Sequence, residues 1–197
     1  MRHSSRGVEV DDRLRTSNRR IFAAGDVASR FKFTHTADAQ ARIVLQNAFF
    51  FGRKKNSSLI VPWVTYTSPE VAHVGLNEAQ ARERGLEVET LTVPMAQVDR
   101  ARLDGDEEGF LRLHLEKGKD RILGATLVAA NAGDMISEVT LAMTAGVGLG
   151  AIAGVIHPYP TQAEVIKRTA DAWRRSKLTP TVQKVLRGWF RLFRLYA

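Results

Sequence analysis

The segment from His157 to Glu164 holds the residue types best suited to proton transfer in this chain, in the order His-Pro-Tyr-Pro-Thr-Gln-Ala-Glu. Pro158 and Pro160 favour extended backbone at the residue before each of them, so the His157 and Tyr159 side chains should project from a stiff loop. An imidazole titrates near neutral pH, whereas a tyrosine with an ordinary pKa of about 10 is a poor base there. This loop is therefore the first candidate for a catalytic site.

The same loop also has a purely structural interpretation. Thr161 and Glu164 have the spacing of a helix capping box, with Thr161 as the N-cap and Glu164 reaching back to it. That arrangement would explain both residues without catalysis. The residues thus leave three alternatives open: Tyr159 acts, His157 acts, or the loop is structural.

A second candidate is the pair Gly25-Asp26. It follows the short apolar run 21–24, which predicts a buried strand that leads into a tight turn. In the structural alternative, Asp26 stabilises the turn through local hydrogen bonds. His73 and His114 lie in strand patterns and are expected to be structural. No spacing of Asp, Glu and His predicts a metal site, and the absence of cysteine excludes a zinc finger and a cysteine nucleophile within the chain.

The elements that would position these residues fall into three segments. Residues 1–55 predict a strand, a turn and a helix from about Thr36 to Phe51, which cannot close a core alone. They are therefore expected to be the last piece of an α/β domain. Residues 60–175 predict a complete α+β domain, an antiparallel sheet with helices packed on it. Its expected strands cover residues 61–67, 72–75, 87–93, 110–115 and 122–128, and its expected helices cover residues 77–84, 133–145 and 149–155.

Residues 176–197 form a basic tail. The net charge of the chain is +8, and residues 165–197, with nine Lys or Arg and one acidic residue, account for all of it. A neutral body argues against a nucleic-acid partner. Apolar residues recur with helical spacing at Val182, Val185, Leu186, Trp189, Phe193 and Tyr196. This amphipathic helix is expected either to pack on protein or to lie on a membrane surface.

The amino terminus lacks the apolar stretch of a signal peptide, and no segment has 18 uninterrupted apolar residues. The sequence therefore predicts a cytoplasmic protein, with peripheral membrane contact through the tail as the finer alternative. The apolar helix from Met135 to Val147 is a candidate for the core of a dimer interface.

Four segments, in order, resemble the pyridine nucleotide-disulfide oxidoreductases. Residues 7–26 resemble their second flavin-binding motif, and residues 62–76 look like the opening of their dimerisation domain. Residues 122–136 look like the middle of that domain, and residues 157–164 resemble its signature loop. The Val-Asp-Arg-Ala segment at 98–101 is similar to the mercuric-reductase-like branch.

This resemblance implies a homodimer that uses FAD and NAD(P)H. It implies that Asp26, beside Gly25, binds the ribityl hydroxyls of FAD. The backbone N–H of Thr34 would approach the flavin, with His35 next to it.

In the family, a His directly precedes Pro-Thr, and a Glu five residues later orients its ring. That His acts across the dimer interface as acid or base in the partner's site. Here Tyr159 takes this place, with Glu164 five residues beyond it, and His157 comes two positions too early. The tyrosine resembles mercuric reductase, although the cysteine pair that collects the metal ion in those enzymes has no counterpart here.

Family members also carry a Gly-x-Gly-x-x-Gly motif, a redox cysteine pair and a nicotinamide domain, none of which occurs in these 197 residues. The expected function is thus the C-terminal portion of an FAD-dependent NAD(P)H oxidoreductase, which provides dimerisation and a cross-subunit active-site loop. Its missing partner would be the N-terminal FAD- and NAD(P)-binding portion, without which the isolated chain is expected to be inactive. The alternative is a non-catalytic dimeric interaction module associated with a membrane surface through the basic tail.

Overall fold

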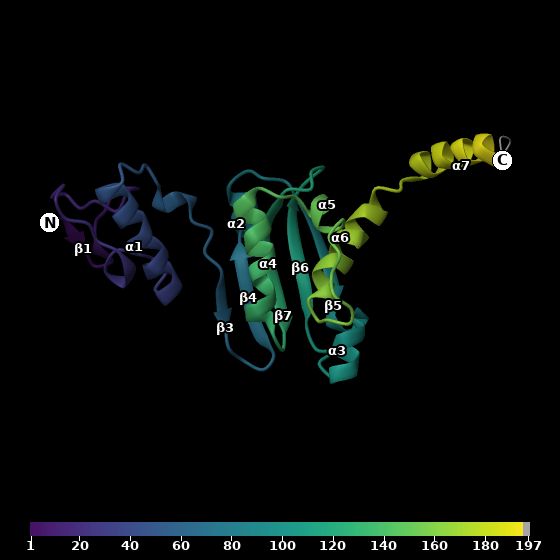
Figure 1. Cartoon of the computed structure of the whole chain (residues 1–197), viewed down its shortest axis with the longest axis horizontal. Helices are drawn as coiled ribbons and strands as arrows, with labels where there is room; N and C mark the ends of the chain where they lie inside the picture. The colour runs from purple at the N-terminus through teal and green to yellow at the C-terminus, as the bar shows by residue number, and fades with distance from the viewer. Residues whose placement is uncertain (195–197) are drawn as a thin grey trace. The chain divides into compact units, whose positions relative to one another are not determined.

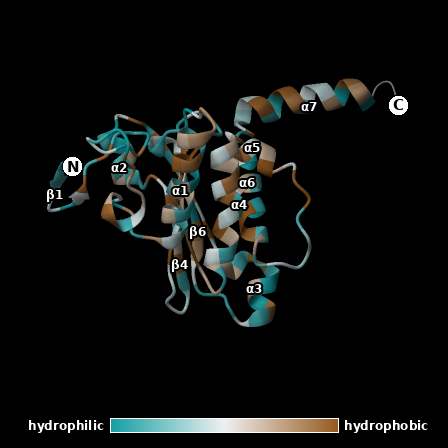
Figure 2. Cartoon of the chain, turned by 60° about the vertical axis from the view of Figure 1, so that its left-hand side comes forward, coloured by the Kyte–Doolittle hydropathy of each residue, from teal (hydrophilic) through white to brown (hydrophobic). Residues whose placement is uncertain are grey.

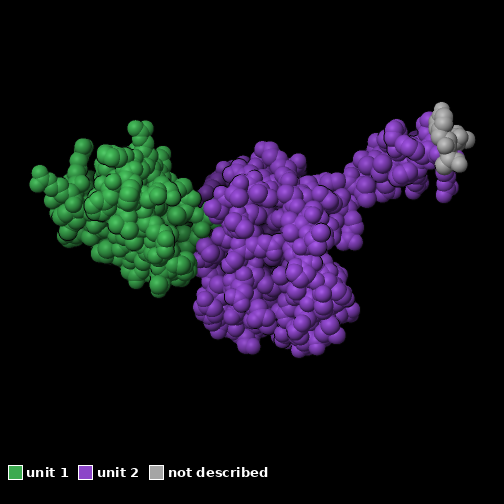
Figure 3. All heavy atoms as spheres, viewed as in Figure 1, with its two compact units in different colours: residues 1–61 green, residues 62–197 purple. Residues whose placement is uncertain are grey.

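The computed structural model describes residues 1–194 and divides the chain into two compact units, residues 1–61 and residues 62–197 (Figure 3). Tyr196, which the sequence assigns to the apolar face of the tail helix, lies outside the described residues.

Residues 1–61 contain one long helix and very short strands. The elements are β1 (His3–Ser4), β2 (Gly7–Val8), η1 (Gly25–Val27), α1 (Thr34–Phe49) and η2 (Asn56–Ser58). The strand expected over residues 21–24 is wrong, because extended backbone becomes a strand only where it has a ladder partner. Within residues 1–61, this run makes a single bridge, between Arg15 and Phe22. The α1 helix is confirmed, with its start two residues earlier than expected.

Residues 62–194 form an antiparallel five-stranded sheet with helices packed on it, which confirms the predicted α+β class (Figure 1). The strand order is β3-β4-β7-β6-β5. The strands are β3 (Trp63–Thr65), β4 (Glu70–Gly75), β5 (Val88–Pro94), β6 (Phe110–Glu116) and β7 (Ile122–Ala129). All four strand pairs are antiparallel.

The helices of this unit vary from one turn to four. They are α2 (Glu78–Glu83), η3 (Met95–Gln97), α3 (Asp99–Asp104), α4 (Ala132–Ala145), α5 (Leu149–Ile152), α6 (Glu164–Ser176) and α7 (Pro180–Arg194). Helix α4 packs on β3, β4 and β7, whereas α6 packs on β5 and β6 (Figure 1). The helix expected over residues 77–84 is present as α2, and Asn77 caps it, since its side chain accepts a hydrogen bond from the Gln80 N–H.

Alternation along β6 separates the two faces of the sheet. Leu111, Leu113 and Leu115 are fully buried, and in a strand such i, i+2 residues share one face. Phe110, Arg112 and His114 therefore occupy the opposite face. That second face also carries His73 of β4, whose neighbour in the β7 register is Thr126.

Because of the two histidines on this face, we expect the stability of the fold to decrease at acidic pH. His73 Nδ1 lies 2.9 Å from Thr126 Oγ1, and His114 Nδ1 lies 3.0 Å from Thr90 Oγ1. Burial lowers the pKa of both rings below the ordinary value. Around pH 6 the unfolded chain therefore binds more protons than the folded chain, so stability is full above about pH 7 and falls as the pH drops below about 6.5.

Urea unfolding should accordingly show a lower midpoint at pH 5.5 than at pH 7.5. Replacing both rings, as His73→Gln and His114→Gln, should flatten this dependence. A midpoint that stays level or rises on acidification of the unmodified chain would contradict the assignment.

Candidate functional site

The loop between α5 and α6 places His157 and Tyr159 in opposite environments. The His157 side chain is 6% exposed, with Nε2 2.9 Å from Glu138 Oε1 on α4. Its Nδ1 faces the Val155 carbonyl oxygen at 3.3 Å. The ring thus fastens the loop to α4 and has both nitrogens engaged.

Tyr159, by contrast, is 71% exposed and points away from the core. Its hydroxyl donates a hydrogen bond of 3.2 Å to Oδ2 of Asp99, which is the first residue of α3. The negative charge of Asp99, and the hydrogen bond to it, raise the pKa of Tyr159 above its ordinary value. The phenol is therefore protonated at neutral pH.

Arg168 joins Asp99 to Glu164. The guanidinium places one NH2 3.3 Å from Asp99 Oδ2 and its Nε 3.1 Å from Glu164 Oε1. Within the described residues, the other oxygen of Glu164, Oε2, is buried and has no hydrogen-bond partner. Glu164 thus approaches Tyr159 through Arg168 and Asp99, and no direct hydrogen bond joins the two among the described residues.

The capping box expected from Thr161 and Glu164 is wrong. Helix α6 begins at Glu164, and its N-cap, Ala163, already has helical angles (φ −60°, ψ −17°). Thr161 therefore lies too far before the helix to cap it, and its Oγ1 donates instead to the Pro158 carbonyl oxygen at 2.9 Å. This bond folds the loop back on itself.

Three further polar residues hold the loop and were not singled out as site residues from the sequence. Gln162 Nε2 donates to Asp104 Oδ2 at 3.1 Å and to Asp106 Oδ2 at 3.0 Å, and its Oε1 accepts from Asn131 Nδ2 at 3.3 Å. Asp99 and Arg168 are the other two. The i, i+4 spacing of Glu164 and Arg168 was a usable sequence signal for one contact, but no local pattern joins Gln162 to α3.

Apolar side chains close to this loop remain exposed. Most of the apolar face of α4 packs on its own sheet, with Met135, Ile136 and Val139 buried. This helix is the candidate for the dimer core, and the side chains it can offer a partner are the apolar ones that remain exposed. Leu141 of α4 is 68% exposed, and Ile156 in the loop is 94% exposed.

In residues 1–61, Gly25 and Asp26 form the turn before α1. Gly25 has φ +77°, which favours glycine, and its N–H donates to the buried Gln40 Oε1 at 2.7 Å. Backbone bonds from Ala28 N and Ser29 N to the Gly25 carbonyl complete the turn. Among residues 1–194, the exposed Asp26 carboxylate has no hydrogen-bond or ion-pair partner, so it does not stabilise the turn as the structural alternative required.

Thr34 is the first residue of α1, and no side chain caps this helix. The first N–H of an α-helix lacks an acceptor within the helix, so the Thr34 N–H is suited to a ligand oxygen. Thr36 Oγ1 in the same turn is buried without a hydrogen-bond partner among the described residues. The His35 ring stacks on Phe33, with centroids 5.1 Å apart.

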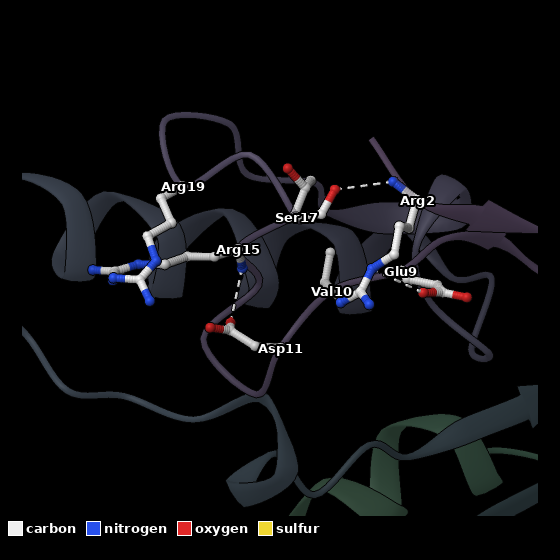
Figure 4. Close-up of a pocket in the computed structure, with 8 residues that line it drawn as sticks. Arg2, Glu9, Val10, Asp11, Arg15, Ser17 and Arg19 are labelled. Carbon is white, nitrogen blue, oxygen red and sulfur yellow. Dashed lines mark hydrogen bonds and ion pairs between the residues drawn. The ribbon is translucent and has the colours of Figure 1, made fainter.

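A separate open pocket of about 500 Å³ lies in residues 1–61 (Figure 4). Three arginines contribute to its lining, Arg2, Arg15 and Arg19, and Asp11 Oδ1 accepts from the Arg15 N–H at 2.9 Å. The pocket contains none of the site residues predicted from the sequence. Among residues 1–194, no cluster of His, Asp and Glu could hold a metal ion, and no helix is both long and apolar enough to cross a membrane.

Family models match most of the chain. The pyridine nucleotide-disulphide oxidoreductase dimerisation domain matches residues 61–170, and a second model, pyridine nucleotide-disulphide oxidoreductase, matches residues 2–41.

Individual relatives agree with these matches. Mercuric reductase from Streptomyces lividans is 40% identical over 84% of this chain and 35% of its own length. Dihydrolipoyl dehydrogenase from Staphylococcus aureus is 36% identical over 87% of this chain and 36% of its own length. The chain thus spans about a third of these curated relatives. The HOCl-induced flavoprotein disulfide reductase RclA from Escherichia coli superposes with a TM-score of 0.78, at 30% identity, over 86% of this chain and 40% of its own. This chain belongs to the pyridine nucleotide-disulphide oxidoreductases.

Proposed function

We propose that this chain is the C-terminal portion of an FAD-dependent NAD(P)H oxidoreductase, in which it provides dimerisation and an active-site loop for the partner subunit. The observation that carries the proposal is the arrangement of that loop within the dimerisation domain. One side chain, Tyr159, is held outward by Asp99, while His157 fastens the loop to α4. A loop that acts on another subunit needs an exposed side chain, here Tyr159, and a buried contact that holds the loop in place, here that of His157.

In this proposal, Tyr159 is the residue that meets the substrate. Because it is protonated and its proton points at Asp99, the phenol oxygen offers lone pairs outward, and it is poorly suited to abstract a proton. His157 and Glu164 are positioning residues: the first holds the loop against α4, and the second orients Arg168. In this proposal, the residues of the partner subunit that face the loop would determine which substrate and which electron acceptor are used.

The turn before α1 fits the ribityl and flavin end of FAD. The exposed carboxylate of Asp26 suits hydroxyl donors, Gly25 leaves room for a close approach, and the uncapped N–H of Thr34 suits a ligand oxygen. His35 would lie beside that oxygen. When bound, FAD would supply the two-electron redox chemistry, with NAD(P)H as the hydride source.

The 197-residue chain by itself should not retain FAD. The residues that fit the cofactor contact only one end of it, and a Gly-rich loop for the pyrophosphate is absent from the sequence. Each missing polar contact lowers binding by on the order of 1 kcal/mol. The purified chain should be colourless, and its spectrum should lack the visible absorbance band of a bound flavin. A yellow protein with one flavin per chain would contradict this expectation.

The dimer is the part of the proposal that can be tested on this chain directly. At micromolar concentration, it should sediment at about twice its mass of 21.9 kDa, since a stable interface of standard size buries on the order of 1,600 Å². A monomer at that concentration would remove the cross-subunit role of the loop.

We also propose that α7 makes a peripheral contact with a membrane. This contact is compatible with the enzyme and also with the alternative function, a non-catalytic dimeric interaction module. The observation that favours it is that no residue of α7, Pro180–Arg194, is buried. A chain that ends at Thr179 should stay in the supernatant under conditions in which the full chain sediments with lipid vesicles.

A further inference from the structure

Hydrophobic and hydrophilic residues alternate along helix α7, Pro180–Arg194 (Figure 2). At 100° per residue, its apolar side chains cover one face, and its basic side chains gather on the reverse. The apolar set is Val182, Val185, Leu186, Trp189, Phe190, Leu192 and Phe193, and the basic set is Lys184, Arg187, Arg191 and Arg194. From residue 180 to residue 197 the sequence has no Asp or Glu.

Within the described residues, the apolar face has no partner. Its side chains are 37% to 67% exposed, and the indole of Trp189 packs edge-on against Phe193 with ring centroids 5.0 Å apart. The side-chain hydrogen bonds at the start of the helix are local, to Leu178 and Thr179. A 15-residue helix is marginal in water by itself, so this face requires a surface that covers it.

The charges of α7 identify the kind of surface. A protein groove that covers the apolar face would leave the four basic residues on the reverse in solvent and would make no use of their charge, and residues 1–164 of this chain are neutral overall. An anionic bilayer offers both features in one plane, namely hydrocarbon for the aromatic side chains and phosphate for the guanidinium groups. At 15 residues with four charges, the helix suits a position along the surface rather than across it.

We propose that α7 lies in the headgroup region of an anionic phospholipid bilayer, where Trp189 and Phe193 insert between the lipids and Lys184, Arg187, Arg191 and Arg194 contact acidic headgroups. This inference rests on the membrane contact proposed above and adds the lipid class to it. Each basic residue near an acidic surface strengthens binding by about fivefold, so the four together favour anionic over neutral vesicles by several hundredfold. Salt weakens this preference because it screens the charges.

The test is co-sedimentation of the full chain with two kinds of vesicle, phosphatidylcholine alone and phosphatidylcholine with one third phosphatidylserine. Binding should be strong to the second kind and weaken as salt is added. The double variant Arg187→Gln and Arg191→Gln should bind anionic vesicles about thirtyfold more weakly. The matched control is Arg6→Gln and Arg20→Gln, two exposed arginines of residues 1–61, which removes the same charge and should bind as the unmodified chain does.

The insertion is tested separately with Trp189→Ser, which should weaken binding and abolish the blue shift of tryptophan fluorescence that vesicles otherwise cause. Since α7 has no buried residue, none of these variants should change the melting temperature of the body. Equal binding to both kinds of vesicle would contradict the preference for anionic lipid but would still support the membrane contact. No binding to either kind, or loss of the dimer in the chain ending at Thr179, would overturn both, and the second result would make α7 a protein contact.

Discussion

Replacing Tyr159 by phenylalanine is expected to lower turnover of the complete enzyme by about 100-fold, the usual effect of removing one well-placed polar group from an active site. The change deletes only the hydroxyl that donates to Asp99. Because the side chain is 71% exposed, the fold should not be affected. Steady-state turnover and flavin content should be measured together, and the flavin content should stay unchanged.

The matched control is His157→Ala. This variant loses the buried ring and leaves the partly buried Glu138 carboxylate without its partner, so the free energy of unfolding should drop by about 1–3 kcal/mol. Turnover per folded enzyme should change far less than in the Tyr159 variant. If His157→Ala abolishes turnover while Tyr159→Phe is silent, the roles assigned to the two residues are reversed.

Replacing Ile156 by arginine is expected to dissociate the dimer. The isoleucine is 94% exposed in the single chain, and it lies in the loop that we propose enters the partner. Burying an unpaired guanidinium at an interface costs several kcal/mol, which raises the dimer dissociation constant by about 100-fold or more. Analytical ultracentrifugation over a concentration series measures this change.

Two controls make that result specific. Val27→Arg adds the same charge at an exposed apolar position of residues 1–61 and should leave the dimer intact. The melting temperature of the Ile156 variant at high concentration tests whether its subunit still folds. An Ile156→Arg chain that dimerises as tightly as the unmodified chain would show that the interface lies elsewhere.

Local pattern predicted the five strands of the sheet and the helices α1, α4 and α7, because each is encoded within a few residues, but it did not predict the 13-residue helix α6. The alternating leucines of β6 are visible in the sequence, and the structure places this strand over residues 110–116, against 110–115 expected. Helix α3, at six residues, is too short to show a period of 3.6. The strand at residues 21–24 failed for a different reason, because it depends on a ladder partner that local pattern does not reveal.

The site was predictable in part. Its loop was recognisable from Pro158, Pro160 and the residues between and around them, but the contacts that decide their roles join distant segments. Tyr159 reaches Asp99, 60 residues earlier, and His157 reaches Glu138, 19 residues earlier. The spacing of Thr161 and Glu164 fits a capping box, but spacing alone does not determine the residue at which the helix starts. In the structure Ala163 already has helical angles, so the helix starts after Thr161 rather than at it.

The claim that Tyr159 acts in the partner's site is tested most directly by mixing two inactive subunits of the complete enzyme. One carries Tyr159→Phe, and the other carries Asp26→Leu, which we expect to lose FAD. If the loop acts across the interface, each mixed dimer contains one site with an intact flavin turn and an intact Tyr159. Random pairing should then restore about a quarter of the unmodified activity. If the loop acts within its own subunit, no site in any mixed dimer is complete, and an inactive mixture would contradict the account.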